Sequence, residues 1–267
     1  MTVIQHPPVF STLSDDRFLS ICHEVTQRRP LVHCLTNEVV QEITANVLLA
    51  CGTSPAMVVG EGEVEQFASL SSAVLVNIGT PYTQRVDMMK KAAKVAVEKG
   101  IPWVLDPVAA GVIPWRDQII NELIALQPTV IRGNASEILA LAGIGHGGQG
   151  VDSTDSSASA VTAAQSLARQ HHVIVAVTGE SDYVTDGEKT IRIPGGHEMA
   201  TFVVGTGCSL SALVAAFCAA DTNHLEATAS ALKVAKTAQE IAWKSAKRPG
   251  SFHVAYLDAL YEIMFKR

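Results

Sequence analysis

The sequence predicts an α/β protein with a mostly parallel central sheet and helices on both faces, and two observations support this. Short apolar runs rich in Val and Ile, each closed by a turn residue, are typical of buried strands. These runs span 73–79, 102–108, 129–134 and 172–179. Apolar residues at helical spacing fill 82–100 and 157–171, between successive strands. Strands that alternate with helices form parallel sheets, whose ligands bind beyond the carboxyl ends of the strands.

Three further segments complete the predicted fold. A hairpin with Asp-Gly at its turn is expected at 183–195, as a β insertion before the final helices. The tail 225–267 has a helical pattern that breaks at "RPGS", and it is expected to pack on the sheet. The Gly- and Ser-rich segment 143–157 is predicted to be a flexible surface connection, with a phosphate-binding loop that closes over a nucleotide as the alternative.

Composition restricts the class of protein. The 267 residues are 48% hydrophobic and 17% charged, which suits a well-buried core. A net charge of -6 and scattered Lys and Arg argue against nucleic acid as a partner. Asp221 interrupts the apolar run after Cys208, so we expect no membrane span. The N-terminus does not resemble a signal peptide, and five cysteines without a CxxC pair favour a reducing cytoplasm over a disulfide framework or zinc.

The stretch "GTGC" combines two glycines and a cysteine at the start of an apolar helical run. Gly205 and Gly207 allow a tight turn with free N–H groups, and the following helix adds the positive end of its dipole. Such a turn is typical of an anion site. Cys208 would there have a lowered pKa and could accept a proton or act as a nucleophile, although small buried cysteines are also common core residues.

Polar side chains follow or end three of the predicted strands, and a parallel sheet would bring them to the "GTGC" turn. They are Asp106 in "LDPV", Arg132, Asn134 and Glu137 in "RGNASE", and Thr178 and Glu180 in "VTGE". Carboxylates for magnesium, a guanidinium for phosphate and a proton acceptor together suit phosphoryl transfer. Each has a structural alternative: Asp106 as a turn residue, Glu137 as a solvated helix residue and Thr178 as a strand cap. Only the joint occurrence of these residues favours a catalytic site over structural roles.

Missing motifs narrow the reaction further. The chain has no GxxxxGK[ST] loop and no GxGxxG after an early strand, which excludes a P-loop ATPase. GxSxG is also absent, so a serine hydrolase has little support. A cysteine hydrolase based on Cys208 stays as an alternative, because sequence alone does not place His33 or His197.

Five segments together resemble the hydroxyethylthiazole kinase family, the thiamin-salvage branch of the ribokinase-like superfamily. They are "LVHCLTNEVVQEITANVLLACGTSPAMV", "LDPVAAG", "IRGNASEI", "VTGE" and "GTGCSLSALVAAFCA", in the family's order over nearly the whole chain. The resemblance implies one ribokinase-like domain over residues 1–267, a three-layer α/β/α sandwich. It also implies ATP as co-substrate, Mg²⁺ as cofactor, and a homotrimer with active sites at subunit interfaces.

The resemblance also implies roles for individual residues. Met57 and Asn37 match the thiazole-binding region, and Gly205 matches a substrate contact beside the anion hole. The catalytic turn comprises Gly205, Gly207 and Cys208. Cys208 stands where related kinases place a catalytic aspartate, and a weak base suffices there because positioning and charge neutralisation provide most of the rate.

The remaining matched residues concern the nucleotide. Arg132 and Thr178 match contacts to ATP phosphates. Asp106 and Glu137 match acidic residues near the magnesium, with water between ion and carboxylate. Glu38 and Gln41 fall on a helix expected to border the thiazole pocket, and their effect on selectivity is open.

The expected reaction is phosphorylation of the hydroxyl of 4-methyl-5-(2-hydroxyethyl)thiazole by ATP, for thiamin phosphate synthesis. The alternatives are a hydroxymethylpyrimidine kinase of the same superfamily, a nucleotide-dependent repair hydratase or dehydratase of this fold, and a non-catalytic thiazole sensor. Cys208 and "HCLTN" argue against the hydratase. The retained phosphate and magnesium groups argue against the sensor.

Overall fold

The computed structural model describes residues 10–143 and 155–265, and its described strands form one eight-stranded sheet with the order β2-β1-β3-β4-β5-β6-β7-β8. Neighbours from β2 to β6 pair in parallel, whereas β7 and β8 are antiparallel. The strands are β1 Leu31–Leu35, β2 Ser54–Ala56, β3 Ala73–Asn77, β4 Trp103–Asp106, β5 Val130–Asn134, β6 Ile174–Thr178, β7 Asp182–Thr185 and β8 Thr190–Ile193.

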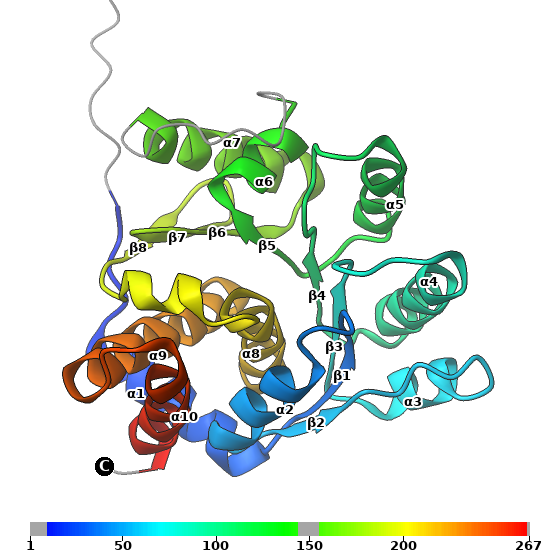
Figure 1. Cartoon of the computed structure of the whole chain (residues 1–267). Helices are drawn as coiled ribbons and strands as arrows, with labels where there is room; N and C mark the ends of the chain where they lie inside the picture. The colour runs from blue at the N-terminus through cyan, green and yellow to red at the C-terminus, as the bar shows by residue number, and fades with distance from the viewer. Residues whose placement is uncertain (1–9, 144–154, 266–267) are drawn as a thin grey trace, which may run out of the picture.

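Helices cover both faces of the sheet (Figure 1) and bury a separate apolar cluster on each. One face carries α3 Val64–Leu70, α4 Thr83–Lys99, α5 Pro114–Ile124, α6 Ala135–Leu141 and α7 Asp155–His171. The other carries α1 Asp15–Arg28, α2 Gln41–Ala50, α8 Thr206–Ala220, α9 His224–Ser245 and α10 Pro249–Phe265, with the short 3₁₀ helix η1 Glu198–Phe202 before α8. The predicted three-layer arrangement is therefore present.

The strands and helices predicted by periodicity are found close to their expected bounds. Gly100 ends α4 in the left-handed conformation, with φ of 66°. The hairpin also forms, and Gly187 in its turn has φ of 98°. It is not an insertion, however, because β7 pairs with β6 and so extends the central sheet. The expectation was wrong because the two strands are too short and too alternating to reveal their pairing partner.

Three further expectations concern the start of α2, the loop before α7 and a membrane span. Glu38 precedes α2 instead of lying on it, because the helix begins at Gln41. The loop residues 144–154 are outside the described part of the chain, so the predicted connection at 143–157 is not tested there. None of the described helices combines the length and apolar character needed to cross a bilayer.

Helix α8 is apolar on all sides and occupies the centre of one layer. It packs against β1, β3 and β4 as well as α2 and α9, and most of its residues are buried. A helix without a polar face is stable only in such a position. This burial fixes the N-terminus of α8 at the carboxyl ends of the central strands.

Candidate active site

The parallel register brings polar strand ends together. Asn77 at the end of β3 is aligned with Asp106 at the end of β4, and Asn134 of β5 is aligned with Thr178 of β6. Arg132 lies within β5 and reaches towards both pairs. The carboxyl ends of four neighbouring strands thus meet the N-terminus of α8, as expected for a ligand site in this class of sheet.

Asp106 is a buried carboxylate, only 1% exposed. Its Oδ2 accepts hydrogen bonds from Asn77 Nδ2 at 2.8 Å and Ser211 Oγ at 2.7 Å, and lies 3.7 Å from Arg132 Nη1. Burial raises the pKa of Asp106 to about 7, Arg132 opposes that rise, and the nearby charge of Glu137 adds to it. The group therefore titrates near neutral pH, as functional carboxylates often do.

Glu137 holds two backbone segments beside Asp106. Its Oε2 accepts from the N–H of Asn134 at 2.8 Å, which completes a capping box at α6. Its Oε1 accepts from the N–H of Ala109 at 2.9 Å, in the loop after β4. Each oxygen keeps a free lone pair. Two neighbouring carboxylates that repel one another suit a hard cation such as Mg²⁺, which binds one or two protein carboxylates and retains water.

Arg132 joins the strand ends to α8. Its Nη1 donates to the carbonyl of Gly207 at 3.0 Å, and its Nη2 donates to Thr178 Oγ1. A Cβ on Gly207 would stand 3.3 Å from Nη1, so a glycine allows this close approach. Arg132 is 8% exposed, and no described atom accepts from its buried Nε. A cationic group with a spare donor is therefore held at the site.

The turn before α8 leaves backbone donors free. Gly205 is the N-cap in the left-handed region, with φ of 87°, and no side chain caps this helix. Within the described chain, no hydrogen bond uses the N–H groups of Thr206, Gly207 or Cys208. Unpaired N–H groups at the positive end of a helix are a suitable site for an anion.

Asp106 forms a hydrogen-bonded network with Asn77 and Ser211, called the Asp106 network below. Cys208 is half-buried beside it. Asn37 Nδ2 lies 3.5 Å from its Sγ and 2.9 Å from Asn77 Oδ1. Burial and the charge of Asp106 raise the pKa of the Cys208 thiol. The expectation of a lowered pKa was wrong, because desolvation and a neighbouring carboxylate outweigh the helix dipole. A thiol in this state is protonated at neutral pH.

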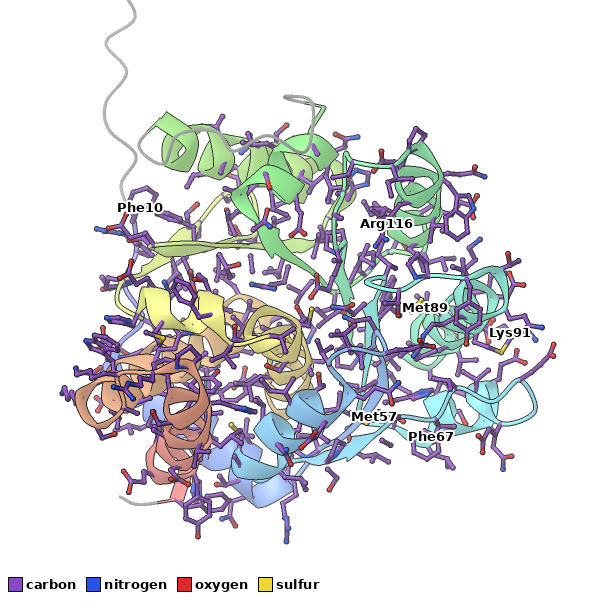
Figure 2. The ribbon with its side chains drawn as sticks, viewed as in Figure 1. Phe10, Met57, Phe67, Met89, Lys91 and Arg116 are labelled. Atoms are coloured by element: carbon purple, nitrogen blue, oxygen red, sulfur yellow. The ribbon has the colours of Figure 1, made fainter. Side chains whose placement is uncertain are left out.

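The two residues predicted to bind the thiazole follow different strands. Asn37 follows β1 and its Oδ1 accepts from the N–H of Val39. Met57 follows the edge strand β2, so β1 and β3 separate its strand from β4. It is half-buried and packs against the cluster on the α2 and α8 face, and Figure 2 shows it at this edge of the sheet. Asn37 therefore lies in the Asp106 network, whereas Met57 does not.

A cavity of about 590 Å³ opens next to Arg132. The residues that line it include Thr178, Glu180, His197, Gly207 and Lys236. It extends from the carboxyl end of β6 to the segment between β8 and η1, which is large enough for a nucleotide-sized ligand. Among the described residues, no hydrogen bond joins His197 to Cys208, and the His197 ring stacks on Trp243 with centroids 3.8 Å apart. His33 is also unavailable, since it is buried and bonded to the carbonyl of Val58.

Sequence reasoning missed several residues of the site. Asn77 lies near the end of the predicted strand 73–79, as Asp106 does in 102–108, and could have been found by the same signal. Ser211 lies within an apolar helical run and gave no signal. Arg116 of α5 (Figure 2) donates to the carbonyls of Ile78 and Val108 at 2.6 and 3.1 Å. Its position in a helix far along the sequence from β3 hid this role.

Solved structures of other proteins superpose on this chain. The Bacillus subtilis pyridoxal kinase, solved as an ADP complex, superposes with a TM-score of 0.59 at 19% identity, over 78% of this chain and 90% of that one. This likeness shows the fold alone, a ribokinase-like α/β sandwich. The structure of a hydroxyethylthiazole kinase protein from Pyrococcus horikoshii superposes with a TM-score of 0.85 at 41% identity, over 92% of this chain and 93% of that one.

Sequence comparison identifies the branch. The hydroxyethylthiazole kinase of Citrobacter koseri is 53% identical over 234 residues, which are 88% of this chain and 89% of that protein. A profile described as the hydroxyethylthiazole kinase family matches residues 22–266. The chain belongs to the hydroxyethylthiazole kinase family, as the resemblance in its motifs predicted.

Proposed function

We propose that this protein transfers the γ-phosphoryl group of ATP to the hydroxyl of 4-methyl-5-(2-hydroxyethyl)thiazole, giving ADP and the thiazole phosphate used for thiamin phosphate synthesis. The observation that carries the proposal is the meeting of Asp106 and Arg132 with the free N–H groups of α8. Family membership supplies the thiazole alcohol as acceptor. The chemistry of the site supplies the reaction type.

The chain's own groups act mainly by position and charge. The hydroxyl oxygen attacks the γ-phosphorus and its proton is released, while the bond to the ADP oxygen breaks and negative charge spreads over the phosphoryl oxygens. Arg132 and the N–H groups of Thr206 to Cys208 neutralise that charge without reorganising, which is the main source of rate. Thr178 fixes the Arg132 guanidinium. We assign ATP binding to Arg132 and Thr178.

Magnesium fits the two carboxylates described above. Asp106 and Glu137 would hold it, through water, and the ion when bound neutralises phosphate oxygens. Within the described residues, no group of three or more His, Cys, Asp or Glu is arranged to hold a metal ion. Two carboxylates suffice for an ion that retains most of its water and binds phosphate oxygens.

The acceptor is assigned to the other end of the network. Asn37 lies beside Cys208, and Gly205 begins the anion turn, so an alcohol placed between them faces the phosphoryl group. Met57 is proposed as part of the wall for the thiazole ring. These three roles, like those of the nucleotide residues, are proposals that variants test.

We further propose a cytoplasmic homotrimer with active sites at subunit interfaces. An apolar groove of about 300 Å³ runs along Val39, Phe202 and Val204, next to Gly205. These three side chains are each more than 60% exposed, and a large exposed apolar patch marks an interaction surface. All five cysteines are free thiols, which suits a reducing compartment. Light scattering is expected to give three times the chain mass of 28.3 kDa.

The activity is tested by ADP release from the purified protein with ATP and magnesium. The acceptors are the thiazole alcohol, the hydroxymethylpyrimidine alcohol and none, with product masses checked. Thiazole-dependent ADP with a phosphate mass gain is expected. Pyrimidine-dependent release would instead indicate a pyrimidine kinase, and thiazole binding without ADP would indicate a sensor.

Replacing Cys208 with Ala is expected to lower kcat less than tenfold, and Cys208→Asp is expected to retain activity. The raised pKa keeps the thiol protonated at neutral pH, so little thiolate is present to accept a proton, and a loose transition state depends little on proton removal. Single-turnover kinetics with saturating ATP measure the effect. Complete loss in both variants, with ATP binding intact, would point to covalent thiol chemistry.

Replacing Gly205 with Ala is expected to lower kcat/KM at least tenfold. Its φ of 87° is strained for alanine, and a Cβ would stand 2.5 Å from Ile43 Cγ2. The turn must therefore shift, and the N–H groups move with it. The matched control is Gly62→Ala, where a Cβ meets nothing within 4 Å. Equal kinetics for the two variants would contradict the assignment of the turn.

A further inference from the structure

Lys236 of α9 is a buried lysine, 7% exposed, that reaches the link between β6 and β7. Its Nζ lies 2.7 Å from the carbonyl of Gly179, 2.8 Å from that of Glu180 and 3.1 Å from Asp182 Oδ1. An ammonium group has three N–H donors. All three have an acceptor here, so this cation has no free donor for a phosphate.

The acceptors of Lys236 belong to one wall of the cavity. Gly179 and Glu180 directly follow Thr178 and line the cavity together with Arg132. A trans peptide is planar, with its N–H antiparallel to its C=O. Two carbonyls held towards α9 therefore turn the N–H groups of Glu180 and Ser181 away from α9. Asp182 holds the same link from its other end, because its Oδ1 accepts from the N–H of Gly179 at 2.9 Å.

The opposite wall is held by the next turn of the same helix. Gln239 and Glu240 are three and four residues beyond Lys236, so the three side chains share one face of α9. Gln239 Oε1 accepts from the N–H of His197, and Glu240 Oε1 accepts from the N–H of Gly196, each at 3.2 Å. A Cβ on Gly196 would lie 2.8 Å from Lys236 Cδ, so this wall lies directly against the lysine.

Stability is a poor explanation for this buried ion pair. Asp182 is 2% exposed, and burial raises its pKa even though Lys236 stands beside it. Replacing buried ion pairs by apolar residues is often neutral or stabilising, because both ions must be desolvated. All three donors of Lys236 bind acceptors in one short link, so the lysine fixes the shape of that link.

We propose that Lys236 is a positioning residue that sets the β6–β7 link for nucleotide binding without contacting the nucleotide itself. The inference rests on the proposed kinase function, because it assigns the cavity beside Arg132 to ATP. Lysine suits the position because three acceptors surround one nitrogen atom. The planar guanidinium of arginine cannot reproduce that arrangement.

The test compares Lys236→Met with a variant that also carries Asp182→Asn. The single variant leaves Asp182 buried without its ion-pair partner, so its melting temperature is expected to fall. The double variant removes that charge but keeps the Oδ1 acceptor for Gly179, and its melting temperature is expected to return towards that of the wild type. In both variants the Kd for a non-hydrolysable ATP analogue and the KM for ATP are expected to rise about tenfold, with the KM for the thiazole alcohol within twofold.

Lys233→Met is the matched control on the same helix. Lys233 also makes an ion pair, with Asp15 at 2.7 Å, but lies outside the cavity lining. It is expected to leave both KM values unchanged. Wild-type affinity for the ATP analogue in the double variant would overturn the positioning role, as would equal rises in the two KM values. A wild-type protein that binds no ATP analogue would overturn the kinase function and this inference together.

Discussion

Replacing Asp106 with Asn is expected to reduce phosphoryl transfer at least 10²-fold while stabilising the free protein at pH 8. The pKa of Asp106 in the folded chain is about 7, above its ordinary value of 3.8. Between these values the folded chain binds more protons than the unfolded chain, so stability falls as pH rises. The ionised carboxylate then costs on the order of 4 kcal/mol at pH 8, which Asn avoids.

The same titration predicts the pH dependence of each variant. Without nucleotide or magnesium, the melting temperatures of wild type and Asp106→Asn are expected to coincide near pH 4 and to separate progressively above it. Ser211→Ala is the control, because it removes one hydrogen bond to Oδ2 without removing the charge. It is expected to show no stabilisation at pH 8. An Asp106→Asn protein less stable than wild type at every pH would contradict the assigned pKa.

The layered fold follows from local sequence patterns, and so does part of the site. Buried parallel strands such as 73–79 and 129–134 are continuous apolar runs, which periodicity detects directly. Asp106 and Thr178 stand at the ends of such runs, so the topology alone places them at one edge of the sheet. The antiparallel extension by β7 was missed, because strand pairing depends on contacts that a short alternating run does not encode.

Local sequence patterns do not predict pKa shifts or contacts between side chains that are far apart in the sequence. The pKa of Cys208 depends on its burial and on Asp106, which is 102 residues earlier in the chain. Lys236 is one of three lysines in an Ala-rich helix, and only the folded chain shows that its ammonium is enclosed by three acceptors. The proposed role of Met57 comes from family motifs alone, because a half-buried methionine has no chemical signal of its own.

Replacing Arg132 with Lys is expected to lower kcat/KM for ATP about 10³-fold, although the charge is kept. The guanidinium reaches Gly207 and Thr178 through two different nitrogens, and its buried Nε has no acceptor among the described residues. A lysine places one nitrogen there and cannot satisfy both partners while also facing a phosphate. Losing a preorganised donor at developing charge typically costs 10²- to 10³-fold.

The kinetic pattern separates loss of charge stabilisation from general damage to the fold. Arg132→Lys is expected to keep the KM for the thiazole alcohol within twofold, because Arg132 lines the cavity that we propose for the nucleotide. Arg17→Lys is the control: Arg17 also bonds two side chains, Asp221 and Glu226, and Asp221 caps the end of α8 that is opposite the anion turn. It is expected to retain wild-type kinetics. A similar loss of kcat/KM in Arg17→Lys, or a wild-type kcat/KM for ATP in Arg132→Lys, would contradict the role of Arg132 in phosphate binding. Arg132 would then only link β5 to α8.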